Sequence, residues 1–372
     1  MKKILCIFGT RPDAIKMIPL IKQLKLNDKF EIYVCSTWQH KEMLNQVLDA
    51  FHINLDFDLQ VMRDKQTLTT LTSSIILSLD PILKEINPDL VLVHWDTTTW
   101  FASSLVSFYN HIPVWHVEAW LRTFDKWSPF PEEVNRLLIS RISDINFCPT
   151  INNKQHLLNE WVSSKTIYVT WNTAIDAMKL TVSNNYIFKN NILNTINYSN
   201  KIILLTAHRR ENIWKNIEEI CGAIKEVVEK YNDVSVVYPV HLNPAVKEPV
   251  YSLLWNHERI YLTDPLDVFD LHNLINKSYL VATDSWWLQE EAPFLWKPVL
   301  VLRTETERPE AVEAGTVKIV WVYKDDIINN IELLLNNKYE YENMAKAVNP
   351  YWDGTASIKI EKGIMEYFNI KL

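Results

Sequence analysis

Short runs of Val, Ile and Leu alternate with helical stretches from one end of the chain to the other. In order, the runs are KILCIF, EIYVCS, LVLVH, VWHVE, INFCP, TIYVT, IILLT, VSVVYP, IYL, YLVAT, PVLVL and VKIVW. Short, continuously apolar runs separated by helices are typical of parallel strands that are covered on both faces. The alternation therefore predicts an α/β fold of two tandem Rossmann-like, doubly wound domains, with an interdomain cleft at the carboxyl ends of the strands.

A change of texture divides this alternation in two. Residues 181–200 are rich in Asn and weakly periodic, so we interpret them as a connector. The N-terminal domain is then expected over residues 1–180 and the C-terminal domain over residues 201–352. Residues 353–372 contain one more helical stretch, which we expect to pack back across both domains.

The composition excludes several classes of protein. The 372 residues carry a formal net charge of -7, whereas a nucleic-acid-binding protein needs a basic face. No apolar run approaches the ~20 residues of a membrane span. The apolar run near the N-terminus is too short for the hydrophobic region of a signal sequence. The 4 cysteines lie singly, without metal-binding spacing. We expect a cytoplasmic protein with reduced thiols, no bound metal, no nucleic-acid partner and no membrane partner.

Polar and charged side chains collect at the ends of the predicted strands. They include Arg11, Lys16, Asp96, Glu118, Glu132, His208, Arg209, Arg210, His241, Ser285 and Glu291. Each has an ordinary structural interpretation as a helix cap, a dipole partner or a surface charge. Their convergence favours a site instead, because mixed charges tune pKa values for proton transfer and guanidinium groups suit a diphosphate.

Eight ordered blocks carry a family resemblance over nearly the whole chain. They are FGTRPDAIKM, VLVHWDTTT, HVEAWLRT, SPFPEEVNR, AHRREN, YPVHLNP, TDSWWLQEEAP and ERPEAVEAGT. The chain resembles the non-hydrolysing UDP-N-acetylglucosamine 2-epimerases. That resemblance implies the two-Rossmann-domain arrangement of many glycosyltransferases, UDP-N-acetylglucosamine and UDP as ligands, no cofactor and a homodimer. The glycosyltransferase alternative shares the fold but does not account for DTTT, HVEA, PEE and HRRE together.

The resemblance also implies a reaction and its residues. UDP leaves carbon 1 while a base removes the carbon 2 proton, and UDP then adds back to the 2-acetamidoglucal with reprotonation on the opposite face. The implied catalytic residues are Asp96, Glu118, Glu132 and His208. The implied substrate-binding residues are Arg11, Lys16, His208, Arg209, Phe269, Ser285, Trp286, Trp287, Glu291 and Arg308. Positions that contact a second, activating substrate molecule in bacterial members correspond to Gln39, Arg210 and His241.

The departures from the family pattern are nearly all of one kind. Trp stands where relatives carry Gly or another small residue at positions 38, 95, 115, 120, 171, 214, 286, 287, 296 and 352, and the chain has 5 Gly against 15 Trp. If every site needed φ > 0, each would cost roughly 1–3 kcal/mol, and together they would rival a whole domain's stability.

Three explanations stay open for this pattern. The sites are not all strained, or the sequence has been altered or engineered, or the recorded residues differ from those of the natural protein. We expect an altered sequence on an intact epimerase scaffold. The alternative function is a catalytically impaired scaffold that binds the sugar nucleotide weakly.

Overall fold

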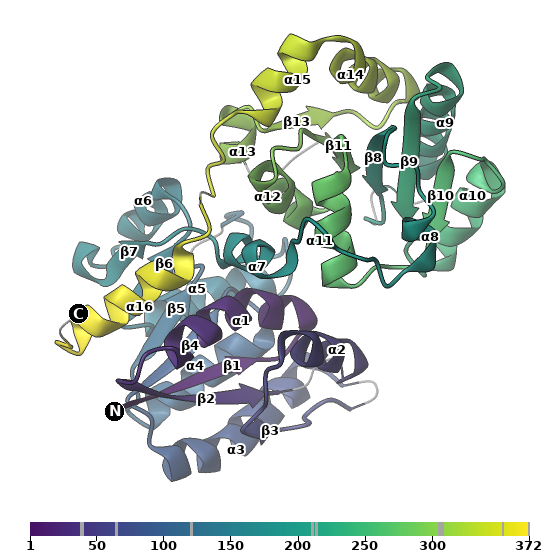
Figure 1. The fold of residues 1–372 in the computed structure, drawn as a ribbon. Coiled ribbons are helices and arrows are strands. Elements are labelled where there is room, and N and C mark those ends of the chain that lie inside the picture. The colour runs from purple at the N-terminus through teal and green to yellow at the C-terminus, as the bar shows by residue number, and fades with distance from the viewer. Residues whose placement is uncertain are drawn as a thin grey trace. The chain divides into compact units, whose positions relative to one another are not determined.

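The chain forms two compact α/β units. The computed structural model describes residues 1–37, 41–63, 66–119, 122–209, 212, 215–303, 309–351 and 353–370. Unit 1 comprises Met1–Leu180 and Asp353–Leu372, and unit 2 comprises Thr181–Trp352. Each unit has a parallel sheet with helices packed against it (Figure 1).

Unit 1 contains a sheet of 7 strands in the order β3-β2-β1-β4-β5-β6-β7. Its strands are β1 (Lys2–Phe8), β2 (Phe30–Ser36), β3 (Phe57–Asp58), β4 (Leu90–His94), β5 (Val114–Val117), β6 (Ile145–Cys148) and β7 (Ile167–Val169). Its helices are α1 (Arg11–Lys25), α2 (Lys41–Phe51), α3 (Leu68–Ile86), α4 (Thr98–Tyr109), α5 (Glu132–Ile142), α6 (Ile151–Asn159), the short 3-10 helix η1 (Ser164–Thr166) and α16 (Ala356–Tyr367). Helix α7 (Thr173–Thr181) ends where unit 2 begins.

Unit 2 contains a sheet of 6 strands in the order β10-β9-β8-β11-β12-β13. Its strands are β8 (Lys201–Thr206), β9 (Val234–Pro239), β10 (Ile260–Thr263), β11 (Leu280–Thr283), β12 (Val299–Leu302) and β13 (Val317–Val320). Its helices are α8 (Asn191–Asn194), α9 (Lys215–Lys230), α10 (Pro244–Leu254), α11 (Val268–Lys277), α12 (Trp286–Phe294), α13 (Pro309–Glu313), α14 (Lys324–Asn336) and α15 (Lys338–Ala345). The order matches the first 6 strands of unit 1, with β8 in the place of β1 and β11 in the place of β4.

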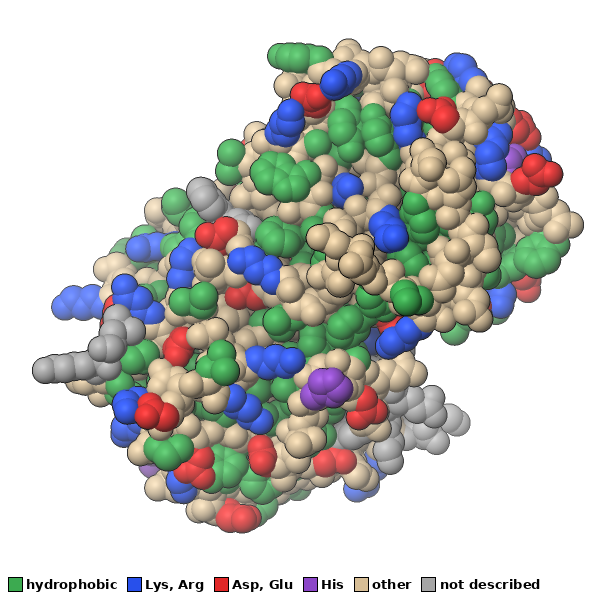
Figure 2. Space-filling view, viewed as in Figure 1, with side chains coloured by type: hydrophobic (Ala, Val, Ile, Leu, Met, Phe, Trp, Pro, Cys, Tyr) green, Lys and Arg blue, Asp and Glu red, His purple; other side chains and the backbone are tan. Residues whose placement is uncertain are grey.

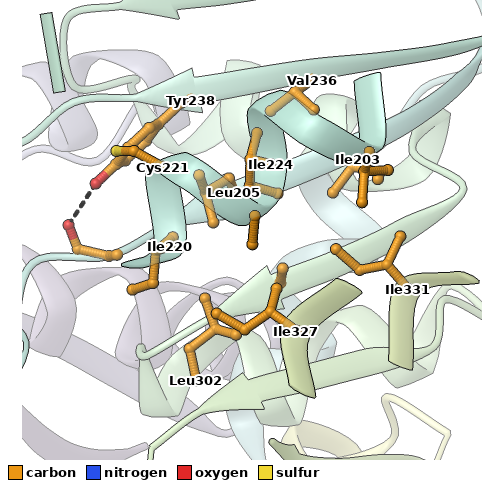
Figure 3. Close-up of a cluster of buried hydrophobic side chains, with 14 of the residues drawn as sticks. Ile203, Leu205, Ile220, Cys221, Ile224, Val236, Tyr238, Leu302, Ile327 and Ile331 are labelled. Carbon is orange, nitrogen blue, oxygen red and sulfur yellow. Dashed lines mark hydrogen bonds between the residues drawn. The ribbon is translucent and has the colours of Figure 1, made fainter. Parts of the chain in front are cut away.

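The strands are apolar throughout because helices cover both faces of each sheet. In unit 2 one cluster joins strand residues such as Ile203 and Val236 to Ile220 and Ile224 of α9 and Ile327 of α14 (Figure 3). All five side chains are fully buried. The hydroxyl of Tyr238 lies at the edge of the cluster and donates to the carbonyl of Ala207 at 2.7 Å. Packing of this apolar surface is the main force that holds each unit together.

The structure confirms the predicted α/β class and two parallel sheets, and it adds elements that the pattern did not reveal, among them α3 and β3. Helix α3 (Leu68–Ile86) is rich in Thr and Ser, which are weak helix formers, and contains Pro81. It is stabilised by a capping box between Thr67 and Thr70 and by packing against α4. Strand β3 has only two residues, at the edge of its sheet.

The surface is of mixed charge. On the face shown in Figure 2, Lys and Arg side chains are interspersed with Asp and Glu. Within the part of the chain that the structure describes, no helix is both long and apolar enough to cross a membrane.

Several tryptophans have left-handed backbone. Trp95, Trp171 and Trp296 have φ values of 52°, 75° and 60°, and Trp161, which the sequence pattern did not single out, has 66°. A side chain at such a φ brings Cβ close to the following carbonyl oxygen. Trp286 and Trp287 begin helix α12 instead and do not have left-handed backbone. Among the positions of the set that the structure describes, backbone strain is therefore limited to Trp95, Trp171 and Trp296.

Removing one of these side chains should stabilise the protein. We expect Trp161→Gly to raise the free energy of unfolding by about 1 kcal/mol, because glycine adopts this φ without a Cβ clash. Little packing is lost, since the indole is 90% exposed. Urea unfolding followed by circular dichroism measures the change. Trp255→Gly is the matched control, because Trp255 ends α10 at φ -60° and should gain nothing. Equal effects in the two variants would contradict the argument.

Candidate functional site

The turn after β1 opens helix α1 in unit 1. Thr10 is the N-cap, its side chain accepts from the backbone of Asp13, and the Asp13 carboxylate accepts from the backbone of Thr10 in return. Gly9 is required here, because a Cβ would overlap the hydroxyls of Thr37 and Thr99, which lie 2.9 Å from one another. Arg11 follows as the first residue of the helix and is half-buried.

A buried ion pair lies beside this turn. Lys16, one turn into α1, places Nζ 2.6 Å from Oε2 of Glu118, and both side chains are 2% exposed. Oε1 of Glu118 accepts from the Thr173 hydroxyl at 2.9 Å and lies 3.3 Å from Nε2 of His94. Glu118 follows β5 directly and has φ 54°. The left-handed backbone indicates that the carboxylate is held in place by its partners.

The environment of Glu118 keeps it ionised. Burial raises the pKa of this carboxyl, but the opposing charge of Lys16 and the His94 imidazole outweigh burial and hold the pKa well below its ordinary value. The Lys16 ammonium group donates to the Glu118 carboxylate and neutralises its buried charge.

Asp96 lies in the opposite situation at the end of β4. Its side chain is 2% exposed, and Oδ2 is 3.3 Å from Nε of Arg136. Burial raises the pKa of Asp96 to about 8; Arg136 opposes this shift and the neighbouring Glu132 carboxylate adds to it. With this pKa, Asp96 can exchange a proton near neutral pH. Glu118, at the end of the neighbouring strand β5, stays charged.

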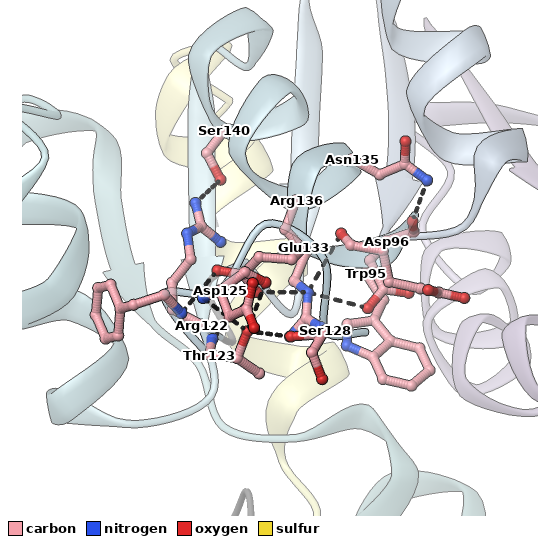
Figure 4. A network of polar contacts seen from close by, with 12 residues as sticks. Trp95, Asp96, Arg122, Thr123, Asp125, Ser128, Glu133, Asn135, Arg136 and Ser140 are labelled. Atoms are coloured by element: carbon pink, nitrogen blue, oxygen red, sulfur yellow. Dashed lines mark hydrogen bonds and ion pairs between the residues drawn. The ribbon is translucent and has the colours of Figure 1, made fainter. Parts of the chain in front are cut away.

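Helix α5 and the loop before it hold Asp96 in place (Figure 4). The Asn135 amide donates to the backbone carbonyl of Asp96 at 2.9 Å. Glu133 accepts from the backbone N–H groups of Thr123 and Phe124 at 3.1 and 3.2 Å and also approaches Arg136 at 3.7 Å. Of the two adjacent glutamates, Glu133 is therefore tied to the loop, while Glu132 is half-buried at the start of the helix and close enough for its charge to raise the pKa of Asp96.

His116, within β5, has a structural role. Its Nε2 lies 2.7 Å from the carbonyl of Trp95, and burial lowers the pKa of the imidazole to about 3. The ring is therefore neutral, and Nε2–H donates to the carbonyl. This bond supports the left-handed turn at Trp95 that delivers Asp96 to the sheet edge.

In unit 2, Asp284 organises the corner between β8 and β11. Its Oδ2 accepts from the backbone N–H groups of His208 and Arg209 at 2.7 and 2.8 Å and from the Asn212 amide at 2.9 Å. The residue is fully buried. Three donors on Oδ2 stabilise the buried carboxylate and fix the backbone of His208 and Arg209.

His208 is presented by this clamp. Its Nδ1 lies 3.4 Å from Oδ1 of Asp284, and its ring stacks on that of His241 at a centroid distance of 5.6 Å. Burial lowers the pKa of His208; Asp284 opposes the shift, and the charges of Arg209 and His241 add to it. The lowered pKa favours a neutral His208, whose backbone is fixed by Asp284.

Two guanidinium groups converge on the indole of Trp286. The Arg209 and Arg303 carbons Cζ lie 4.7 and 5.3 Å from the ring centroid. Ser285 is the N-cap of α12 and uses no side-chain bond for capping, while its N–H donates to the Thr283 hydroxyl at 2.9 Å. Trp287 is half-buried in the first turn of the same helix. Basic groups at a helix N-terminus form an anion site, and here both of them contact an indole.

The other predicted binding residues lie on α11 and α12. Glu291 is 6% exposed, and its Oε2 is 3.5 Å from Nε2 of His272. Phe269 is half-buried, and its carbonyl accepts from the Asn273 amide at 2.8 Å. Gln39, Arg210 and Arg308 fall outside the described residues.

Several residues of these clusters were not singled out from the sequence. They are Asp13, His94, Thr173, His272 and Arg303. His94 had a visible signal, since it is a polar residue at the end of an otherwise apolar strand. Thr173, His272 and Arg303 had none, because their roles depend on contacts with residues far away in the sequence.

The model of one protein family, described as UDP-N-acetylglucosamine 2-epimerase, matches residues 22–365. The chain belongs to the UDP-N-acetylglucosamine 2-epimerase family. The enzyme of that name from Bacillus subtilis (strain 168) is 48% identical over 369 residues, covering 99% of this chain and 96% of that protein. This confirms the resemblance read from the motifs.

Solved structures agree with this assignment. The UDP-GlcNAc 2-epimerase from Neisseria meningitidis bound to UDP-GlcNAc is 45% identical, with a TM-score of 0.88 over 98% of this chain and 100% of that one. The Methanocaldococcus jannaschii enzyme in complex with UDP-GlcNAc and UDP is 30% identical, with a TM-score of 0.79 over 98% and 99%. A sucrose-phosphate synthase at 12% identity and a TM-score of 0.64 shares the fold alone. The comparisons favour an epimerase over the impaired-scaffold alternative.

The buried carboxyl of Asp96 should make stability fall with pH. Its folded-state pKa of about 8 exceeds the ordinary value, so between about pH 5 and about pH 8 the folded chain keeps a proton that the unfolded chain has lost. Its contribution to stability is therefore complete at low pH and is lost as the pH rises, with a slope of at most about 1.4 kcal/mol per pH unit.

Asp96→Asn removes this titration. We expect the free energy of unfolding of the variant, relative to the unsubstituted chain, to increase steadily across that window in urea titrations. Asp28→Asn, at an exposed side chain, controls for a general change in net charge. A difference that stays constant with pH would show that Asp96 ionises in the folded protein as it does in the unfolded one.

Proposed function

We propose that the protein interconverts UDP-N-acetylglucosamine and UDP-N-acetylmannosamine by elimination and re-addition of UDP. A base takes the proton from carbon 2 while the bond between carbon 1 and the diphosphate oxygen breaks, giving 2-acetamidoglucal and UDP. The diphosphate oxygen then adds back to carbon 1 as a proton is delivered to the other face of carbon 2. One observation above all supports the proposal: neighbouring buried carboxyls at one sheet edge, Asp96 and Glu118, have pKa values displaced in opposite directions.

In unit 1 the carboxyl groups handle the protons. Asp96, with a pKa of about 8, can both accept and donate a proton near neutral pH. Glu132 is the second proton-transfer group, since it is half-buried and close enough to raise the pKa of Asp96. Glu118 completes the acidic triplet, and its salt bridge holds Lys16 and His94 in fixed positions. Arg11, at the first position of α1, contributes a positive charge for the diphosphate.

In unit 2 the nucleotide is held. His208 and Arg209 stabilise the leaving diphosphate. Asp284 fixes the backbone of both residues, so their side chains are positioned before the reaction. Ser285 and the N-terminus of α12 bind a phosphate group, and Glu291 accepts the ribose hydroxyls. Phe269 packs against the nucleotide. The family motifs assign Arg308 to the substrate and Gln39, Arg210 and His241 to a second, activating substrate molecule; of these, Gln39, Arg210 and Arg308 lie outside the described residues.

Isotope incorporation tests the reaction. Turnover in heavy water should place deuterium at carbon 2 of the product, because the removed proton exchanges before the carbon is reprotonated. Added 2-acetamidoglucal and UDP should be converted to sugar nucleotide. Nuclear magnetic resonance of the product measures both. Epimerisation with complete retention of the original hydrogen, and no use of the glucal, would refute the elimination mechanism.

Substitutions should separate proton transfer from nucleotide binding. Asp96→Asn and Glu132→Gln should each lower kcat by about 100-fold or more while the Kd for UDP changes little, since general acid–base groups act on the reacting carbon. Arg11→Ala should instead weaken UDP binding by roughly tenfold or more, because it removes a charge-assisted contact. Steady-state kinetics and calorimetry distinguish the two classes. Unchanged kcat in both amide variants would rule out the proposed roles of these carboxyls.

The indoles at positions 286 and 287 should weaken UDP binding. Trp286 contacts both the Arg209 and the Arg303 guanidinium groups, which would otherwise be available to a phosphate. Trp286→Gly combined with Trp287→Gly should therefore strengthen binding by about tenfold or more, as two charge-assisted contacts become available. Isothermal titration with UDP measures the gain, and Trp255→Gly in the same unit is the control. If the unsubstituted chain already binds as tightly, the indole leaves the anion site open.

We also propose that the protein is a homodimer. In support, Leu77 on α3 and Phe108 and Tyr109 on α4 are 75%, 59% and 62% exposed on neighbouring helices. Analytical ultracentrifugation of the chain and of Phe108→Glu tests this proposal.

A further inference from the structure

We propose that His272 is a positioning residue for the nucleotide site, orienting the carboxylate of Glu291 toward the ribose. This inference rests on the role of Glu291 in the proposed function. His272 lies on α11, and its side chain is 1% exposed. Its Nε2 is 3.5 Å from Oε2 of Glu291, and its Nδ1 is 2.6 Å from the hydroxyl of Thr181.

The two contacts together select one tautomer of the ring. A neutral imidazole has one N–H donor and one acceptor nitrogen. A carboxylate cannot donate, so the proton belongs on Nε2, which faces Glu291. Nδ1 then accepts, and the Thr181 hydroxyl is its donor. The hydroxyl of Thr181 therefore fixes the ring in the state that donates to Glu291.

The support for this relay is itself rigid. Asn273, the next residue on α11, is fully buried; its amide donates to the carbonyl of Thr181 at 2.8 Å and its Oδ1 accepts from the N–H of Ser183 at 2.9 Å. Thr181 and its neighbour Ser183 are thus joined to α11 through Asn273 as well as through His272. The imidazole lies beside one oxygen of Glu291 and so limits rotation of the carboxylate. The two adjacent hydroxyls of a ribose both donate, and a carboxylate in a fixed orientation can accept from both.

The test uses the preference for ribose over 2′-deoxyribose. The ratio of the Kd of 2′-deoxy-UDP to that of UDP, measured by calorimetry on the full chain, reports on the hydroxyl contact whatever the absolute affinity. His272→Asn has no donor that reaches Glu291, so the ratio should fall by about fivefold or more, as expected when a charged hydrogen bond loses its alignment. In turnover, KM should rise with little change in kcat.

A matched variant separates positioning from folding. The side-chain amide of Gln reaches the position of Nε2, so His272→Gln should recover most of the preference for UDP. Thr181→Val removes the hydroxyl that fixes the tautomer and should lower the ratio in the same direction. An unchanged ratio in His272→Asn, or an equal loss in His272→Asn and His272→Gln, would overturn the proposal. Glu291→Gln is the reference: if it leaves the ratio unchanged, the assignment of Glu291 to the ribose has failed, whatever His272 does.

A second inference comes from the backbone. We infer that the cell from which this chain originates inserts glycine at the left-handed tryptophan positions. Trp161 and Trp296 directly follow the C-cap residues of α6 and α12, at the position where helices most often end in a left-handed glycine. Trp95 and Trp171 occupy left-handed positions at the ends of strands.

Asn tolerates this region best after glycine, and Asn87, Asn256 and Asn369 also have left-handed backbone. Trp has no such tolerance, so its repeated use at left-handed positions is not what independent substitutions would produce. A single codon that this cell reads as glycine, and that other cells read as tryptophan, replaces one residue type by one other at scattered positions. Such decoding is also in the direction of the composition, in which Gly is scarce and Trp abundant, with 5 Gly and 15 Trp.

Mass spectrometry of the protein isolated from its own cells tests this inference. Peptides that contain positions 95, 161, 171 and 296 should each be lighter by the difference between an indole side chain and a hydrogen atom. The same gene expressed with tryptophan codons in another host provides the reference masses. Tryptophan in the peptides from the natural source would overturn the inference.

Discussion

In both units, buried carboxyl groups at the ends of parallel strands determine how the surrounding loops and helix starts are arranged. A buried carboxylate must be paired with a cation, be surrounded by hydrogen-bond donors, or take up a proton. All three solutions are present: Glu118 pairs with Lys16, Asp284 accepts from backbone and amide N–H groups, and Asp96 keeps its proton to a pKa of about 8. The loops and helix starts around them are arranged to make these solutions possible.

The same contacts connect stability with chemistry. The donors that satisfy Asp284 also fix the backbone of His208, so the clamp that keeps a buried charge tolerable is what orients an imidazole. In unit 1 the left-handed Trp95 and Glu118 place carboxyls at the sheet edge, and neighbouring bonds such as that from His116 to the Trp95 carbonyl hold the strained backbone. Strain of this kind persists only where surrounding contacts determine the conformation.

Much of the fold could be predicted from the sequence, because strands buried on both faces leave a continuous apolar pattern. Helix α3 could not, since its Thr- and Ser-rich sequence has little helical propensity and depends on packing against α4. For the site, the residue types and their places after strands were visible, and the family motifs supplied roles. The pKa displacement of Asp96, the engagement of Lys16 by Glu118 and the relay through His272 depend on distances between segments remote in sequence. The location of strain also required the backbone, as Trp161 and Trp286 show.

Because the two sheets share a strand order, each strand of unit 2 has a corresponding strand in unit 1. β4 and β11 occupy the same place beside β1 and β8; Asp284 directly follows β11, and Asp96 comes two residues after β4. The same edge of both sheets thus carries a buried aspartate. In unit 2 the donors around Asp284 make its carboxylate an anchor for backbone, whereas around Asp96 burial raises the pKa to about 8, so the surroundings and not the residue type set what each carboxyl does.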